Sequence, residues 1–151
     1  IWLLIKACDA INLSHYLFLD YIKLYYDYTL QYGFDHEKGG FYNAGSFSEP
    51  ADQLDKVWWV QSEGLVASLR MYQLTNQKKH LTVFLQTLNW IDNHQVDWEN
   101  GDWYSKVNGQ GETAGDKAGH WKSPYHNGRA MLECLAILSS LSKTKDTFPS
   151  D

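Results

Sequence analysis

Apolar residues recur at helical spacing along most of the chain, and two long stretches interrupt this pattern. The three- and four-residue apolar repeat of amphipathic helices covers residues 1–11, 13–32, 56–75, 78–94 and 127–142. In residues 34–54 and 97–125 the repeat fails and glycine is frequent. The pattern predicts an all-α chain in the order helix, helix, long loop, helix, helix, long loop, helix.

The two interrupting stretches are long for connections inside a compact domain. Loops beyond about 15 residues are uncommon unless they carry function. Gly39-Gly40 followed by Phe41 predicts a tight turn or short hairpin in the first loop, and residues 103–107 predict a short strand in the second. Because each loop follows a pair of helices, we expect both at one end of an array of helical hairpins. Such an array is either an open solenoid or a closed α/α toroid, with the candidate chemistry at the loop end.

Composition narrows the function classes. The chain of 151 residues is 15% aromatic, with seven Trp and ten Tyr, and has a net charge of −5. Rings in an acidic chain commonly form walls for sugar rings, although they also fill helical cores. Without a block of basic residues, a nucleic-acid surface is not expected. Cys8 and Cys134 lie in apolar helical segments, so we expect reduced core thiols, which suits a cytoplasmic protein.

The ends of the chain carry two further expectations. The chain opens on Ile1 inside a helical pattern, without an initiator Met or a capping residue, so we expect its upstream part to be missing. The opening apolar run is interrupted by Lys6 and Asp9 and is too short for a signal peptide or a membrane span. Residues 144–151 are predicted to be a polar tail.

The strongest candidate for proton transfer is His126. Pro124 disfavours helix in the residue before it, so His126 lies where a loop enters the last helix. A helix N-terminus disfavours an imidazolium, and a neutral ring can accept a proton. Arg129, three residues on, points to the same side and could hold a hydroxyl or an oxyanion. The alternative is a structural imidazole that bridges the loop.

Two further clusters combine aromatic and acidic side chains. Trp59 and Glu63 are four residues apart and share a helix face, as an indole and a carboxylate do in sugar pockets. Alternatively, Trp59 is core and Glu63 is solvated. Residues 97–104 form either a carbohydrate-facing loop or a turn packed by its own rings. Asp97 and Glu63 could also be a glycosidase carboxylate pair, but the sequence does not give the distance between the two carboxylates.

The remaining histidines do not predict a metal site. His15, His36, His80 and His94 have no metal-ligand spacing, and His120 is expected at the surface. The chain also has no phosphate-cradling glycine motif and no serine nucleophile motif.

Three segments together resemble the N-acylglucosamine 2-epimerase superfamily. They are Trp58-Trp59-Val60-Gln61-Ser62-Glu63, Gly101-Asp102-Trp103-Tyr104, and the nine residues from Trp121 to Arg129. Within that superfamily the sequence Pro-Tyr-His-Asn-Gly-Arg at residues 124–129 resembles the cellobiose 2-epimerase branch. The resemblance implies that residues 1–143 are the C-terminal part of an (α/α)6 barrel.

The resemblance also implies an activity. Members of that branch epimerise C2 of the reducing-end glucose in β-1,4-linked disaccharides such as cellobiose, lactose or mannobiose. The ring opens, a C2 proton is removed to give an enediolate, and a proton returns to the opposite face without metal or nucleotide. His126 matches one of two catalytic histidines. The matching substrate-binding positions are Trp2, Trp58, Trp59, Glu63, Trp121 and Arg129.

The chain departs from the family pattern in two ways. The second catalytic histidine and its glutamate would precede Ile1, and Asp102 stands where the family usually has Glu. We therefore expect this chain alone to be inactive or nearly so, and to expose apolar flanks on both edges. The competing expectations are a monosaccharide enzyme of the same superfamily (mannose isomerase or N-acylglucosamine 2-epimerase), a toroid glycosidase, or a non-catalytic sugar-binding fragment.

Overall fold

The helices follow the predicted order. The computed structural model describes residues 1–145, and its α-helices are α1 (Trp2–Ala10), α2 (Leu19–Tyr32), α3 (Trp58–Thr75), α4 (Lys78–Trp90) and α5 (Tyr125–Lys145). A 3-10 helix, η1 (His15–Phe18), precedes α2, and a π-helical turn, η2 (Ile91–Gln95), follows α4. The prediction of a mostly helical chain is confirmed.

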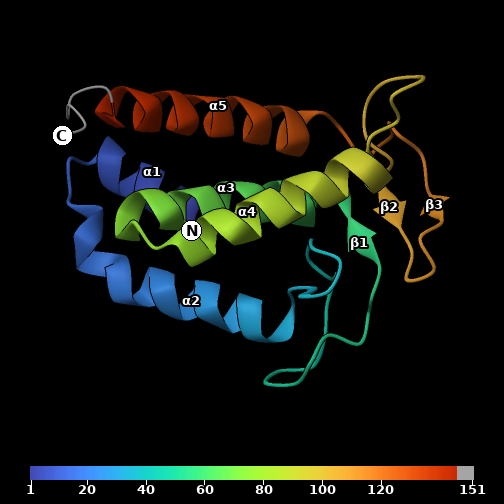
Figure 1. The fold of residues 1–151 in the computed structure, drawn as a ribbon, viewed down its shortest axis with the longest axis horizontal. Coiled ribbons are helices and arrows are strands. Elements are labelled where there is room, and N and C mark those ends of the chain that lie inside the picture. Colours follow the sequence, from blue (N-terminus) through green and yellow to red (C-terminus); the bar gives the residue numbers. More distant parts are fainter. Residues whose placement is uncertain (146–151) are drawn as a thin grey trace.

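Helix α3 is the centre of the molecule and packs against both α4 and α5 (Figure 1). Leu65, Val66 and Leu69 on α3 are fully buried, because their spacing places them on the faces that meet the neighbouring helices. Phe84 from α4 and Ile137 from α5 complete this main core.

A second core joins the two N-terminal helices to α3. Ile5 of α1, Ile22 and Tyr26 of α2, and Met71 of α3 are all buried in it. The Tyr26 hydroxyl also donates a hydrogen bond to Ser68 Oγ at 2.9 Å. The second core therefore fixes the faces of α1 and α2 relative to α3.

The two long loops meet at one end of the helices, as the sequence predicts. The first loop ends in β1 (Lys56–Val57), which pairs antiparallel with β2 (Lys106–Val107) of the second loop. β2 also pairs with β3 (Thr113–Ala114), so the three short strands form one sheet (Figure 1). The sheet closes the loop end and holds the start of α3 there.

The predicted turn at Gly39-Gly40 is confirmed as a short hairpin. Phe34 and Phe41 form an antiparallel bridge across it. The side chain of Gln61 on α3 accepts from the Phe41 amide at 2.8 Å and donates to the Phe41 carbonyl at 2.6 Å. This double contact fixes the hairpin against the second turn of α3.

Four element boundaries differ from the prediction. α2 begins at Leu19 and not at residue 13, because Ser14 is extended and residues 15–18 form the 3-10 helix η1. Of the predicted strand 103–107 only Lys106–Val107 is strand, and Trp103 instead forms an isolated bridge with Val96. Residues 56–57 belong to β1. α5 runs from Tyr125 through Lys145, so it includes the first two residues of the predicted polar tail, and residues 146–151 lie outside the described part.

The expected apolar flanks are present on both sides of the helical layer. On α5, Leu132 and Leu135 are 70% and 62% exposed, and on α2 Leu24 is 62% exposed. Cys8 and Cys134 are free and buried, as predicted. Within the described residues, no helix is both long enough and apolar enough to cross a membrane.

Candidate active site

The centre of the candidate site is the carboxylate of Glu63, on the second turn of α3. Three side chains from two other helices converge on it. The Trp2 indole Nε1 donates to Oε2, while Arg129 Nη2 donates to Oε1 and His126 Nδ1 lies 2.9 Å from Oε1. A carboxylate offers about four lone-pair positions. Glu63 therefore uses most of its acceptor capacity to hold these side chains.

The contact with Glu63 fixes the tautomer of His126. A carboxylate only accepts hydrogen bonds, so the hydrogen between the two groups resides on Nδ1. In the neutral ring, Nε2 then carries the free lone pair, which is the arrangement a general base needs. The ring is 34% exposed and is the second residue of α5.

Arg129 lies between an aromatic ring and the carboxylate. Its guanidinium carbon is 3.9 Å from the centre of the Trp2 ring, and Nη2 is bound to Glu63. The Nε and Nη1 atoms are buried and have no partner among the described residues. Because unpaired buried donors are costly, an oxygen that reached these two N–H groups would be bound favourably.

A cavity of about 270 Å³ opens beside Glu63. We call it the Glu63 cavity, and its wall includes Trp2, Tyr25, Tyr26, Trp59 and Glu63. Burial raises the pKa of Tyr26 to about 12, so this ring stays neutral. The wall is thus mainly aromatic, with one acidic end.

A second cavity of about 270 Å³ continues from the first. We call it the tyrosine cavity, because Tyr28, Tyr32 and Tyr42 line it together with Asn43. The two cavities share Thr29, Phe41, Trp59 and Val60. Trp59 therefore stands at their junction, with its ring centre 6.1 Å from that of His126.

Two of the predicted sugar contacts lie away from these cavities. Trp58 is 5% exposed, packs in the main core and borders neither cavity, so its role as a substrate contact stays a prediction. Trp121 is 86% exposed and borders neither cavity. Its role as a sugar contact stays a prediction.

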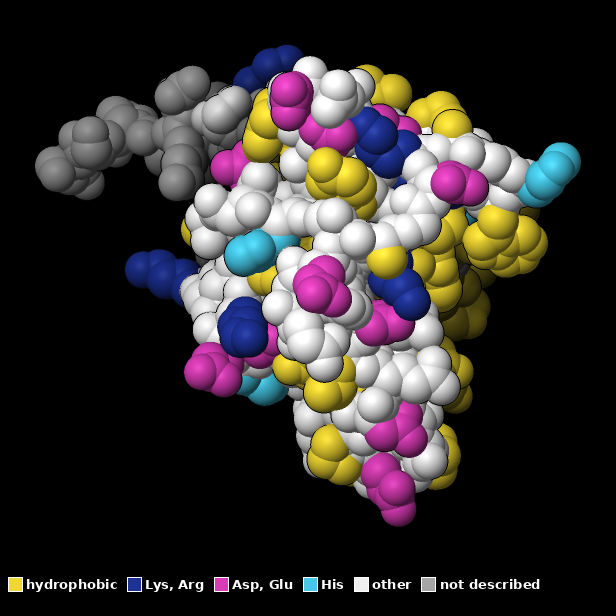
Figure 2. Space-filling model, turned by 90° about the vertical axis from the view of Figure 1, so that its right-hand side faces the viewer, with side chains coloured by type: hydrophobic (Ala, Val, Ile, Leu, Met, Phe, Trp, Pro, Cys, Tyr) yellow, Lys and Arg dark blue, Asp and Glu magenta, His cyan; other side chains and the backbone are white. Residues whose placement is uncertain are grey.

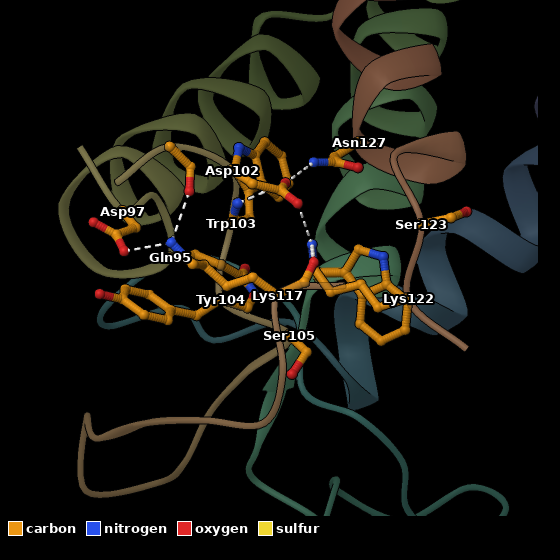
Figure 3. A network of polar contacts seen from close by, with 12 residues as sticks. Gln95, Asp97, Asp102, Trp103, Tyr104, Ser105, Lys117, Lys122, Ser123 and Asn127 are labelled. Atoms are coloured by element: carbon orange, nitrogen blue, oxygen red, sulfur yellow. Dashed lines mark hydrogen bonds and ion pairs between the residues drawn. The ribbon is translucent and has the colours of Figure 1, made fainter. Parts of the chain in front are cut away.

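The proposed carboxylate pair is not brought together. Asp97 is 7% exposed and binds Lys117 Nζ at 2.6 Å (Figure 3). Its carboxylate also accepts from the amides of its own turn. The hydrogen bond from Lys117 holds the pKa of Asp97 well below its usual range. Asp97 borders a different cavity, which shares no lining residue with the Glu63 cavity. The turn is held by hydrogen bonds to Asp97, whereas of its rings Trp98 is 75% exposed and Trp103 packs in the main core.

The sequence analysis missed the tyrosines of the second cavity. Tyr25, Tyr28, Thr29 and Tyr32 follow each other at helical spacing on α2 and line the two cavities. This helical spacing could have identified them as one face of α2. It overlaps, however, with the spacing of the buried residues on the same helix, so the sequence does not separate the two faces. Tyr42 and Asn43 come from the first hairpin, where periodicity gives no indication.

The remaining polar groups are dispersed. The surface at the loop end carries acidic, basic and apolar side chains side by side (Figure 2). Within residues 1–145, no three His, Cys, Asp or Glu side chains are grouped as metal ligands are. His120 is exposed, as predicted.

Comparison with known proteins finds sugar 2-epimerases among the relatives of this chain. The profile of the N-acylglucosamine 2-epimerase (GlcNAc 2-epimerase) family matches residues 1–130. The cellobiose 2-epimerase of Ruminococcus albus is 29% identical over 140 residues, which are 89% of this chain and 35% of that protein. The N-acylglucosamine 2-epimerase of Bos taurus is 32% identical over 114 residues, covering 72% of this chain and 27% of that protein.

Solved structures agree with the sequence relatives. The cellobiose 2-epimerase of Spirochaeta thermophila superposes with a TM-score of 0.75 at 26% identity, covering 93% of this chain and 36% of that one. The helical hairpins are thus part of the expected (α/α)6 barrel. The chain spans about a third or less of the length of these relatives.

Proposed function

Because the chain belongs to the N-acylglucosamine 2-epimerase family, we propose that it supplies one half of the active site of a C2 epimerase for β-1,4-linked disaccharides. The observation that carries this proposal is the contact of His126 Nδ1 with Glu63. It leaves Nε2 as the basic atom of a histidine whose orientation is fixed from two helices. Proton abstraction next to a carbonyl needs such a base.

The chemistry begins with the ring-opened sugar, whose C1 aldehyde acidifies the C2 proton. His126 Nε2 takes that proton, and the C–H bonding electrons move to form an enediolate with the charge on the C1 oxygen. Developing charge of this kind is stabilised by preorganised donors. The free Nε and Nη1 donors of Arg129 are suited to this role.

Epimerisation also requires that a proton return to the opposite face of C2. Among the described residues, no histidine lines the Glu63 cavity, and His126 is the histidine that contacts Glu63. Loss of a general acid or base typically reduces the rate by about 10²–10⁴-fold. We therefore propose that this chain alone is inactive or nearly so, and that a second acid/base comes from another part of the enzyme.

The two connected cavities favour a disaccharide over a monosaccharide. The Glu63 cavity would hold the reacting sugar beside Glu63, the partner of His126, and the tyrosine cavity would hold its neighbour across Trp59. An indole between two rings can stack on an apolar face of either sugar. The cellobiose 2-epimerase relatives support the same choice, whereas the bovine relative keeps a monosaccharide substrate as the second candidate.

The glycosidase alternative has less support. It requires two carboxylates within about 10 Å that flank one bond. Asp97 and Glu63 border separate cavities, and each is held by cationic side chains. A non-catalytic sugar-binding role remains the alternative in which His126 is only structural.

The test is lactose turnover with detection of epilactose by chromatography. We would compare this chain, a version extended upstream to the length of the R. albus relative, and the extended version with His126→Gln. Epilactose from the extended protein alone, abolished by His126→Gln, is the expected result. Epilactose from the short chain would overturn the claim that it is inactive. Disaccharide binding without turnover by either form would identify a binding module, and turnover of free mannose or N-acylglucosamine alone would identify the monosaccharide enzyme.

A further inference from the structure

The chain contains the same hairpin twice, 62 residues apart. Residues 34–42 read Phe-Asp-His-Glu-Lys-Gly-Gly-Phe-Tyr, and residues 96–104 read Val-Asp-Trp-Glu-Asn-Gly-Asp-Trp-Tyr. In both copies the first residue forms an antiparallel bridge with the eighth. Both copies also follow a helix and lie at the loop end.

The hydrogen bonds of the two hairpins match as closely as their bridges. Asp35 Oδ1 accepts hydrogen bonds from the amides two and three residues further on, at 3.0 and 2.9 Å. Asp97 Oδ1 accepts the corresponding two hydrogen bonds at 3.1 and 3.0 Å. A distant lysine then binds the other carboxylate oxygen, Lys56 at 2.7 Å and Lys117 at 2.6 Å. Each lysine also donates to the carbonyl of the first turn glycine. One copy can therefore serve as an internal reference for the other.

The copies differ at their seventh position. Gly40 has a φ of 82°, and a Cβ there would lie 2.9 Å from Gln61 Oε1. Asp102, its counterpart, adopts the same left-handed backbone with a φ of 61°. This region favours glycine, and another residue is uncommon there. The turn itself therefore does not require a carboxylate.

The Asp102 carboxylate instead binds the segment that leads into α5. Its Oδ2 accepts from Lys122 Nζ at 2.8 Å, and its Oδ1 accepts from Asn127 Nδ2 at 2.8 Å (Figure 3). Lys122 is 4% exposed and Asn127 is 8% exposed, whereas the Asp102 side chain is 35% exposed, so both contacts are partly shielded from water. Although burial opposes it, the contacts with Lys122 and Asn127 lower the pKa of Asp102.

Lys122 and Asn127 flank the candidate base His126 in the sequence. Lys122 lies four residues before His126, and Asn127 is the next residue after it in the first turn of α5. The Lys122 ammonium also donates to the Lys117 carbonyl at 2.6 Å, which joins the loop to the same point. A displacement of about 1 Å at a reacting group can reduce a rate by roughly 10²-fold.

We propose that Asp102 is a positioning residue for His126: it fixes the first turn of α5 to the second hairpin, so that Nδ1 meets Glu63. The inference rests on the proposed function for its catalytic consequence, but the geometry it predicts can be measured without turnover. Glu63 orients the ring from α3, and Asp102 places the backbone that carries the ring. The first hairpin has glycine at this point and binds no helix start through it.

The test uses Asp102→Gly, which gives the second hairpin the residue of the first. Glycine relieves the left-handed backbone, so the turn is expected to persist while the carboxylate is lost. The matched control is Asp97→Asn, which removes a carboxylate from the same hairpin without touching Lys122 or Asn127. Asp102→Glu tests rescue, because it retains the charge at a longer reach.

The first readout is ¹⁵N NMR of the His126 ring in this chain, assigned with His126→Gln. We expect Asp102→Gly to reduce the fraction of His126 with hydrogen on Nδ1 and to broaden its signals, Asp102→Glu to restore them in part, and Asp97→Asn to leave them unchanged. Unchanged His126 signals in a folded Asp102→Gly variant would overturn the proposal. An equal effect of Asp97→Asn would also overturn the proposal. It would show that His126 depends on the intact hairpin and not on the contacts of Asp102.

The second readout separates this inference from the proposed function. In the extended, active protein we expect Asp102→Gly to lower kcat by roughly 10- to 100-fold with little change in KM. If no extended form makes epilactose, the proposed function fails while the NMR result still decides the positioning role. A loss confined to KM would contradict the positioning role and place Asp102 in substrate binding.

Discussion

His126 Nδ1 lies 2.9 Å from Glu63 Oε1, across 63 residues of sequence and between two helices that pack against each other. Since Glu63 also binds Arg129 and Trp2, one carboxylate aligns the base, the cationic donor and an aromatic wall. Glu63 and Trp2 line the Glu63 cavity, and the histidine that Glu63 orients lies on the other side of this carboxylate contact.

Glu63→Gln is expected to reduce epimerase activity of the extended protein by roughly 10²-fold or more. A Gln side chain can present an N–H to His126 and so stabilise the wrong tautomer. Steady-state kinetics with lactose measures the loss. Because residues that act as a unit are non-additive, the Glu63→Gln/His126→Gln double variant should be hardly slower than His126→Gln. Additive losses would show that Glu63 acts independently of the histidine.

Trp59→Ala is expected to weaken disaccharide binding by about tenfold, or ~1.4 kcal/mol, because Trp59 lines both cavities. Isothermal titration with cellobiose measures the change. Trp98→Ala is the matched control, since Trp98 is 75% exposed and borders neither cavity. Equal weakening by the two substitutions would contradict the placement of the sugar at Trp59.

Gly64→Ala is expected to destabilise the fold even though alanine favours helix. A Cβ on Gly64 would lie 2.3 Å from a ring atom of Phe41, and overpacking costs about 1–3 kcal/mol against a helix gain of about 1 kcal/mol. Urea denaturation measures the free energy of unfolding. The control is Gly128→Ala on α5, where the nearest atom is Pro124 Cβ at 4.0 Å. That variant should be at least as stable as the original chain.

The stability of the chain is expected to fall as the pH drops below about 6.5. His80 on α4 is 1% exposed, and burial lowers its pKa from 6.5. Because the pKa of His80 is lower in the folded chain, the unfolded chain binds a proton first as the pH falls. The contribution of neutral His80 to stability is therefore complete above pH 6.5 and is lost progressively below it. Between the two pKa values the slope approaches ~1.4 kcal/mol per pH unit.

Urea denaturation at several pH values measures this slope. His80→Phe keeps a ring against Tyr26, whose ring centre is 5.1 Å away, and should flatten the dependence below pH 6.5. His120→Gln, at an exposed position, should leave it unchanged. A slope that persists in His80→Phe would assign the pH dependence to another group.

The exposed face of α5 is expected to cause self-association of this chain. Replacing both Leu132 and Leu135 by Lys should lower the associated fraction in sedimentation velocity while the helical circular dichroism stays unchanged, because both are mostly exposed. Ile137→Lys is the contrasting variant, since Ile137 is 2% exposed and the charge would unfold the core. No change in association on replacing the two leucines would place the contact elsewhere.

The helices were predictable because their signal is local. Apolar spacing located all five, and Trp59 and Glu63 share a face of α3 because four residues make about one turn. The break at Asn12 was predicted, but the start of α2 was placed too early, because residues 15–18 form the 3-10 helix η1. Residue type alone does not predict which side chains face the cavity. Trp58 and Trp59 are adjacent indoles, but the first lies in the core and the second lines the cavity.

The sequence by itself determined the helical order, the meeting of the two loops and the identity of His126, Glu63 and Arg129 as candidates. Only the tertiary structure decided what these residues do for one another. Glu63 was expected to reach sugar hydroxyls, but its oxygens hold His126, Arg129 and Trp2. The physical reason is that hydrogen bonds depend on the relative placement of α1, α3 and α5, which the packing of buried side chains fixes and which no spacing along the chain records.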